Sequence, residues 1–149
     1  MATVTTFLGG QTTSTPAIPA AGLNKVYVLR NRLDFSDTNT AASDVVNALV
    51  IPANTYVIDV LTKVVTAEGG ALTATVGDLS GANSWDAQTD LNGSVGTWTQ
   101  STVGTDAYAA SAARGKVYSS ATYISLTMSA AIADAAVMDV IAICVDLNA

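Results

Sequence analysis

The 149-residue chain is long enough for one domain with a substantial core, and half of its residues are hydrophobic while only 12% are charged, a balance that excludes an intrinsically disordered protein. No stretch approaches the roughly 18 consecutive apolar residues of a transmembrane helix, so we expect no membrane partner. Twelve acidic against six basic residues give a formal net charge of −6, which repels phosphate backbones and argues against nucleic acid as a partner.

The first 24 residues show no periodic pattern and are rich in Thr, Gly, Ala and Pro. Pro16 and Pro19 favour an extended backbone and lack the amide donors of a regular strand. We therefore predict an extended N-terminal arm over residues 1–24, with a disordered tail as the alternative, and a single β-sandwich domain over residues 25–149. The N-terminus also lacks the positive and continuous apolar segments of a secretory signal peptide.

Two strands are predicted at the start of the domain. Over residues 25–35, apolar side chains recur at every second position, the period of a strand. The residues on the apolar face are Tyr27, Leu29, Leu33 and Phe35. Arg30 and Arg32 lie on the opposite face, where they could pair across a subunit contact or simply be solvated. Residues 45–51 form a second strand, closed by Pro52, which cannot donate to a sheet.

Residues 55–66 form the longest predicted strand, and residues 71–76 form the strand that returns from it. Between them, Glu68-Gly69-Gly70 supplies residues suited to the positive φ angles of a tight turn, so we predict a hairpin. The apolar faces are Tyr56, Ile58, Val60 and Val64 on the first strand and Leu72, Ala74 and Val76 on the second.

The segment over residues 77–114 is rich in Gly, Ser, Asn, Asp and Thr. Short strands around residues 96–100 and 107–110 are one interpretation, and a long loop is the other. Its two tryptophans, Trp85 and Trp98, could form a sugar-stacking platform or anchor a protein contact. We favour a third role, in which they are buried as a plug at one end of the sandwich.

The last part of the chain contains a predicted hairpin over residues 116–119 and 122–128, then a small-residue linker or helical turn over 130–136. The final strand, over residues 137–148, is apolar on both faces. One face carries Val137, Ile141, Ile143, Val145 and Leu147, and the other carries Met138, Val140, Ala142 and Cys144. Because a sandwich covers one face of a strand, we expect a neighbouring subunit to cover the other. About eight strands are predicted in all, and a short helix over 41–49 is the second helical alternative. This pattern predicts an all-β fold, a single antiparallel β-sandwich of jelly-roll-like topology.

The composition offers little catalytic chemistry. The chain has no histidine, the side chain most often used as an acid, a base or a metal ligand near neutral pH, and it has no glycine-rich phosphate loop. Its single cysteine, Cys144, excludes an intramolecular disulfide, fits synthesis in a reducing cytoplasm, and lies in an apolar strand where a thiol is expected to be inert. We therefore predict that the protein is not an enzyme, and we assign no catalytic, cofactor-binding or metal-binding residue and no cofactor.

Calcium is the one metal that the acidic residues bring into question. Asp34, Asp37 and Asp44 surround one polar loop, and Asp78 and Asp86 surround another. Neither loop has the regular ligand spacing of an EF-hand, so we interpret both as solvated turns.

Four segments carry a resemblance to a known group of proteins. They are KVYVLRNRLDFSD at 25–37, VIPANTYVIDVLTKV at 50–64, TATVGD at 73–78 and VMDVIAICVDLN at 137–148. Together with the Thr- and Ala-rich composition, they resemble the small structural proteins of tailed bacteriophage virions, most of all the capsid decoration, or cement, proteins.

The resemblance implies a jelly-roll-like sandwich that forms homotrimers and grips the capsid lattice with its arm or its loops. The implied partner is the major capsid protein, and the implied location is the outer capsid surface of the virion, after synthesis in the host cytoplasm. The resemblance implies no catalytic or ligand-binding residue. The alternative is a carbohydrate- or receptor-binding module of a phage head fibre or tail, which the tryptophans and the Asp-rich turns would suit.

Overall fold

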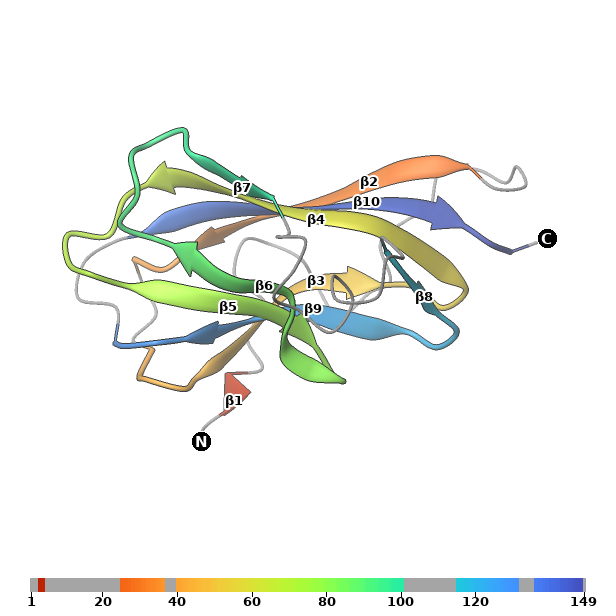
Figure 1. Cartoon of the computed structure of the whole chain (residues 1–149), viewed down its shortest axis with the longest axis horizontal. Coiled ribbons are helices and arrows are strands. Elements are labelled where there is room, and N and C mark those ends of the chain that lie inside the picture. Colours follow the sequence, from red (N-terminus) through yellow and green to blue (C-terminus); the bar gives the residue numbers. More distant parts are fainter. Residues whose placement is uncertain (1–2, 5–24, 37–39, 101–114, 132–135, 149) are drawn as a thin grey trace.

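The structure is a computed structural model that describes residues 3–4, 25–36, 40–100, 115–131 and 136–148. Within these residues, ten strands form two sheets that face each other (Figure 1). The strands are Thr3–Val4 (β1), Val26–Asp34 (β2), Val45–Ile51 (β3), Thr55–Thr66 (β4), Thr73–Asp78 (β5), Gly81–Asp90 (β6), Trp98–Gln100 (β7), Lys116–Tyr118 (β8), Thr122–Met128 (β9) and Val137–Asp146 (β10).

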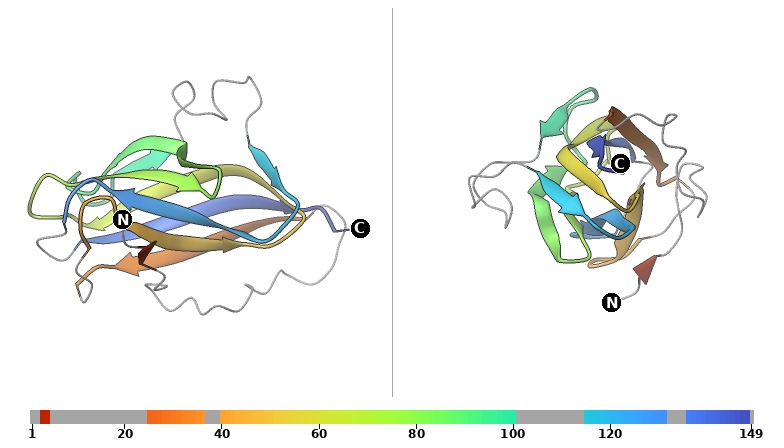
Figure 2. Two further views of the ribbon diagram at one scale, coloured as in Figure 1. Left: turned by 90° about the horizontal axis from the view of Figure 1, so that it is seen from below. Right: turned by 90° about the vertical axis from the view of Figure 1, so that its right-hand side faces the viewer.

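One sheet, here called the β3 sheet, has the strand order β1-β3-β9-β5-β6, and the other, the β10 sheet, has the order β2-β10-β4-β7, with β8 also pairing with β4. All pairings are antiparallel apart from that of β1 with β3. Figure 2 shows the two sheets wrapped around a common core. The prediction of an all-β sandwich is confirmed, and the helical alternative over 41–49 is wrong because residues 45–51 form β3. The described part of the chain contains no helix long and apolar enough to cross a membrane.

Strand β2 shows how the sequence pattern builds the core. Its inward side chains are buried and its outward side chains are exposed, in strict alternation from Val26 to Asp34. The inward apolar residues are Tyr27, Leu29 and Leu33, continued by Phe35. Asn31 also points inward, but its side-chain amide donates to the Ala48 carbonyl oxygen at 2.9 Å, so its burial leaves that donor satisfied. The predicted faces of this strand are confirmed.

The last strand, β10, lies in the middle of its sheet between β2 and β4 (Figure 1). Its core-facing residues are Met138, Val140, Ala142 and Cys144, none more than 1% exposed. On the opposite face, Ile141, Ile143 and Val145 are half-buried, since side chains of the two flanking strands lie beside them. The predicted division into two apolar faces is confirmed, and the described residues do not fully enclose the outer one.

In β4, the predicted faces are wrong at the start of the strand. The register of β4 against β10 shifts at residues 57–59, the position of a β-bulge. The shift turns Val57 and Val60 into the core and leaves Tyr56 and Ile58 half-exposed on the outer face. A two-residue alternation cannot be extended through such a bulge, because the extra residue reverses the direction of every side chain beyond it.

Both predicted hairpins are also wrong. Strand β4 belongs to the β10 sheet and β5 to the β3 sheet, so residues 67–72 cross between the layers instead of closing a hairpin. The crossing is held by backbone hydrogen bonds from the Glu68 amide to the Leu91 carbonyl and from the Leu91 amide to the Leu72 carbonyl. Likewise β8 pairs with β4, whereas β9 pairs with β3 and β5.

The glycine- and serine-rich segment contains a long strand that the sequence pattern did not reveal. Strand β6 runs over ten residues and returns beside β5 through a tight turn, while β7 matches the short strand expected near residue 100. The turn requires Gly77, because a Cβ atom there would lie 2.1 Å from the Gly81 carbonyl oxygen. The strand expected at 107–110 lies outside the described residues.

The predicted N-terminal arm lies almost entirely outside the described residues. Its described portion, Thr3–Val4, pairs in parallel with Val45–Val46 at the edge of the β3 sheet. The linker predicted over 130–136 is described only in part, as residues 130–131 and 136.

Candidate functional site

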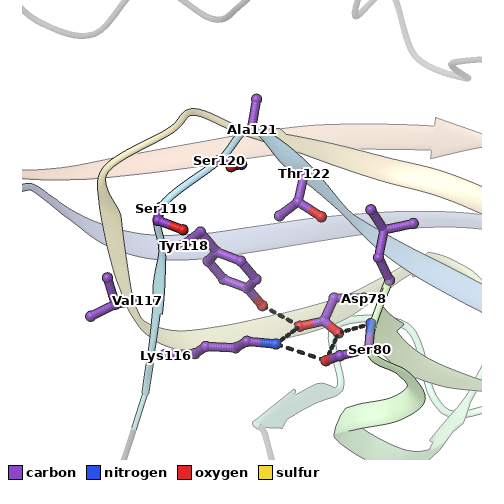
Figure 3. A pocket seen from close by; sticks show the side chains of 10 residues that line it. Asp78, Ser80, Lys116, Val117, Tyr118, Ser119, Ser120, Ala121 and Thr122 are labelled. Atoms are coloured by element: carbon purple, nitrogen blue, oxygen red, sulfur yellow. Dashed lines mark hydrogen bonds and ion pairs between the residues drawn. The ribbon is translucent and has the colours of Figure 1, made fainter.

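A shallow, open pocket of about 280 Å³ lies at one end of the sandwich, where the β5–β6 turn meets β8 (Figure 3). It is lined by residues 78–80 and 116–122. The local sequence shapes its floor, because the Asp78 carboxylate accepts the backbone N–H of Ser80 at 2.8 Å in an Asx turn. Because charged and hydroxyl side chains line it, this pocket is a candidate functional site.

The Asp78 carboxylate is the centre of this pocket. It accepts hydrogen bonds from the hydroxyl groups of Tyr118, Ser80 and Ser84, and it pairs with Lys116 Nζ at 2.9 Å. Burial by itself raises the pKa of Asp78, but the hydrogen bonds from Ser80, Tyr118 and Lys116 outweigh it and lower the pKa from 3.8 to about 2. The carboxylate therefore carries its charge throughout the neutral range.

This arrangement suits a structural link better than a catalytic group. A carboxylate with a pKa of about 2 is a weak base at neutral pH, and its acceptor positions are already filled. The network also reaches the core, since the Trp85 indole donates to the Tyr118 hydroxyl at 3.1 Å and Trp85 is only 3% exposed. It thereby fastens β8 to β6 and to the β5–β6 turn. The prediction that a tryptophan of this region is buried as a plug is confirmed for Trp85.

The same prediction is wrong for Trp98, which lies on β7 and is 53% exposed. Its ring contacts Lys63, whose Nζ lies 5.1 Å from the ring centroid in a cation–π arrangement. The ring is exposed because β7 is a three-residue strand at the margin of the β10 sheet, where only one neighbouring strand flanks it.

The outer face of the β10 sheet carries apolar side chains in two neighbouring cross-strand rows. Strand register places Val26, Val145, Tyr56 and Val117 side by side in one row, and Val28 beside Ile143 in the next. These six residues are here called the outer patch. Its edges are well exposed, with Val26 at 65%, Val28 at 61% and Val117 at 56%. Cross-strand neighbours of this kind form a continuous surface, so the patch is an apolar area and not a set of isolated residues.

A cluster of charges lies beyond the outer patch on the same face. Asp139 of β10 accepts hydrogen bonds from Arg30 at 2.6 Å and from Arg32 at 2.9 Å. The two guanidinium groups cover the carboxylate, which is 1% exposed, while the arginine side chains remain 55% and 53% exposed. The hydrogen bond from Arg32 is the main cause that lowers the pKa of Asp139; burial opposes it and Arg30 adds to it. Both arginines thus pair within the chain, and their exposed remainder leaves the predicted pairing across a subunit contact as a prediction.

The acidic residues considered for calcium are engaged in local contacts. Asp34 accepts the amide of Ser36 at 2.9 Å, Asp44 the amide of Ala41 at 2.8 Å, and Asp86 the hydroxyl of Thr89 at 2.6 Å. Asp78 belongs to the network described above, and Asp37 lies outside the described residues. Among the residues that the structure describes, no three acidic or cysteine side chains are grouped so that they could hold a metal ion.

Cys144 lies in the core on β10 with no exposed surface. Burial raises the pKa of its thiol to about 12, although a hydrogen bond with Tyr27 acts in the opposite direction. The expected packing of Cys144 in the core is confirmed, and a thiol with so high a pKa is a poor nucleophile at neutral pH.

Sequence reasoning identified Asp78 only as a loop residue and missed its partners. The Asx turn at 78–80 has a recognisable signal in the run Gly77-Asp78-Leu79-Ser80-Gly81. The contacts with Lys116 and Tyr118 span 38 and 40 residues of sequence, and no local pattern signals them.

No protein-family model matches the sequence, and no curated protein matches it. Solved structures do share its fold. A chain of the capsid of Ralstonia phage GP4 matches with a TM-score of 0.69 at 18% identity, over 99% of this chain and 100% of that chain. A chain of the capsid asymmetric unit of cyanophage Pam1 matches at 0.63 and 17% identity, over 91% and 95% of the two chains. A chain of the acid-stable capsid of Helicobacter pylori bacteriophage KHP30 matches at 0.54 and 16% identity, over 80% and 86%.

These likenesses confirm the resemblance to phage virion structural proteins at the level of the fold. At 16 to 18% identity they concern the architecture of the chain, and they transfer no individual residue.

Proposed function

We propose that this chain is a non-enzymatic structural protein of a bacteriophage virion. More specifically, we propose a decoration, or cement, protein that forms trimers and binds the major capsid protein at the outer surface of the capsid. The observation that supports this most is the end-to-end match of the fold with a phage capsid chain, 99% of one against 100% of the other.

The proposed mechanism is stabilisation of the assembled shell. A protein that binds neighbouring capsid subunits only when they are assembled shifts the equilibrium towards the assembled state by mass action. The capsid repeats its sites, so a modest free energy per copy acts many times over. In this proposal the sandwich over residues 25–149, with jelly-roll-like topology, forms the trimer, and the arm over residues 1–24 contacts the shell. The chain is made in the host cytoplasm before it joins the virion.

The chemistry of the described residues supports a role without catalysis. Asp78 is held as a permanent anion by its own network, and Cys144 is a buried thiol with a pKa of about 12. Neither group is set up as a base or a nucleophile near neutral pH.

The test is capsid binding. Capsids of the phage that encodes this chain are prepared without it by deleting its gene, then mixed with the purified protein and sedimented. We expect the protein to co-sediment at a saturating, fixed ratio to the major capsid protein and to raise the temperature at which the capsids disassemble. Failure to co-sediment, or binding without any gain in capsid stability, would contradict the cement role.

One observation favours the alternative function, a carbohydrate- or receptor-binding module. Trp98 is 53% exposed, as a sugar-stacking ring must be, although Lys63 lies over one side of it. A glycan array read with and without calcium tests this, with Trp98→Ala as the variant and Val95→Ala, at an exposed residue nearby in the sequence, as the control. Glycan binding that is abolished by Trp98→Ala but not by Val95→Ala would establish the carbohydrate-binding function. The absence of binding to any glycan on the array would refute it.

A further inference from the structure

We propose that the outer patch of the β10 sheet, and not the β3 sheet, is the surface through which one copy of this chain contacts a second copy. The inference rests on the proposed function, which includes a trimer, and adds to it the face that forms the contact. In a trimer, three such faces would meet around the common axis.

The first argument is the continuity of the apolar surface. Val26, Val145 and Tyr56 are direct cross-strand neighbours, and Val117 of β8 extends their row. Val28 and Ile143 form the adjacent row, which ends at Asp59 of β4, so the apolar patch spans four strands and is bordered by this carboxylate. Apolar rows on a twisted sheet pack well on a surface of the same kind, and the patch of a second copy is such a surface.

The second argument is that the polar groups beside the patch are already paired within the chain. Arg30 and Arg32 neutralise the buried Asp139 carboxylate, and the Gln100 amide donates to the Asp59 carboxylate. Covering a charge is costly when the charge has no partner, and much less costly when its hydrogen bonds are already made. The face can therefore be buried without leaving these charges unpaired.

The third argument is charge, and it identifies the occupant. Among the described residues, the outer face of the β10 sheet carries three basic side chains, Arg30, Arg32 and Lys63, and three acidic ones, Asp34, Asp59 and Asp139, so their net charge is zero. The remaining three basic and nine acidic residues of the chain carry the whole charge of −6. Two copies that meet through this face therefore bring no net charge of the described residues against each other. A neutral apolar face suits a contact between two copies that each carry a net charge of −6.

The experiment compares two substitutions of the same kind at equally exposed valines. Val28→Asp places a carboxylate in the patch, whereas Val95→Asp places one in the turn before β7, outside the patch; the two side chains are 61% and 69% exposed. Sedimentation velocity over a concentration series measures the association of each. We expect the wild-type chain and Val95→Asp to associate alike, and Val28→Asp to raise the dissociation constant by about 100-fold or more.

Circular dichroism and the melting temperature show whether each variant is folded, and Val26→Asp, at the other row of the patch, serves as a second variant. Equal association of the patch variants and the wild type would overturn the proposal, and so would a wild-type chain that stays monomeric at every concentration.

Capsid co-sedimentation of the same proteins separates this proposal from the proposed function. A wild-type oligomer that does not bind capsids supports the copy contact and refutes the cement role. A wild-type monomer that binds capsids, and loses that binding through Val28→Asp, overturns the copy contact and assigns the patch to the shell instead.

Discussion

Replacing Asp78 by Asn should destabilise the sandwich by an amount that follows from its pKa. The group titrates at about 2 in the folded chain against a reference of 3.8, and each pKa unit corresponds to about 1.4 kcal/mol. The ionised carboxylate therefore stabilises the fold by about 2 kcal/mol at neutral pH. Asp78→Asn removes this contribution and leaves Lys116 beside a neutral amide, so we expect a loss of about 2 to 3 kcal/mol.

The effect has a defined pH window. Because the folded pKa lies below the unfolded one, the stabilisation is fully present above about pH 4 and is lost as the pH falls towards about 2. Wild type and Asp78→Asn should therefore differ most at neutral pH and converge in acid. Other carboxylates with lowered pKa, such as Asp139, are common to both proteins and cancel in the difference.

Urea unfolding at fixed protein concentration, from neutral pH to about pH 2, measures this difference. Asp90→Asn is the matched control, since Asp90 is exposed and its contact with the Asn92 amide can be kept by an asparagine oxygen. We expect the control to change stability by no more than about 0.5 kcal/mol. Equal losses in the two variants, or a gap for Asp78→Asn that does not close in acid, would refute the assignment of Asp78 as a structural anion.

Three further predictions test the core and its aromatic residues. Leu33→Ala, at a side chain with no exposed surface, should cost about 2 to 5 kcal/mol in urea unfolding; a cost below about 1 kcal/mol would mean that Leu33 is not packed between the sheets. Burial raises the pKa of Cys144 to about 12, so iodoacetamide should label it only after unfolding, and rapid labelling of the folded protein would contradict its placement. Iodide should quench Trp98 but not Trp85, so the fluorescence of Trp98→Phe should resist quenching; efficient quenching in that variant would show that Trp85 is exposed.

The strands with regular alternation could be predicted from the sequence. The faces of β2 follow from its two-residue period, and the extents of β3 and β4 and the two apolar faces of β10 follow from the apolar residues that each segment carries in itself. The faces at the start of β4 could not be predicted, because the bulge near Ile58 arises from the pairing with β10 and leaves no trace in β4 alone.

The pairing of the strands could not be predicted from the local sequence pattern. Glu68-Gly69-Gly70 indicates that the chain turns, but whether the next strand joins the same sheet or the opposite one depends on partners far away in sequence. Strand β6 escaped prediction for a related reason. Its buried positions include Ser84 and Asp86, which are satisfied by hydrogen bonds instead of by apolar contacts, so the strand shows no hydrophobic alternation.

The candidate site, like the fold, could be predicted from the sequence only in part. The apolar outer side of β10 was visible in the sequence as a second hydrophobic face. Its extension by Tyr56 and Val117 depends on strand pairing, as do the contacts of Asp78 with Lys116 and Tyr118.

An electron cryo-microscopy map of the native virion tests the proposed function most directly. We expect density for this sandwich on the outside of the capsid, in groups of three related by threefold axes, with the β10 sheets turned towards one another and contacts to the major capsid protein below. Density for this chain only in the tail, or a capsid surface that lacks it, would contradict the proposed role.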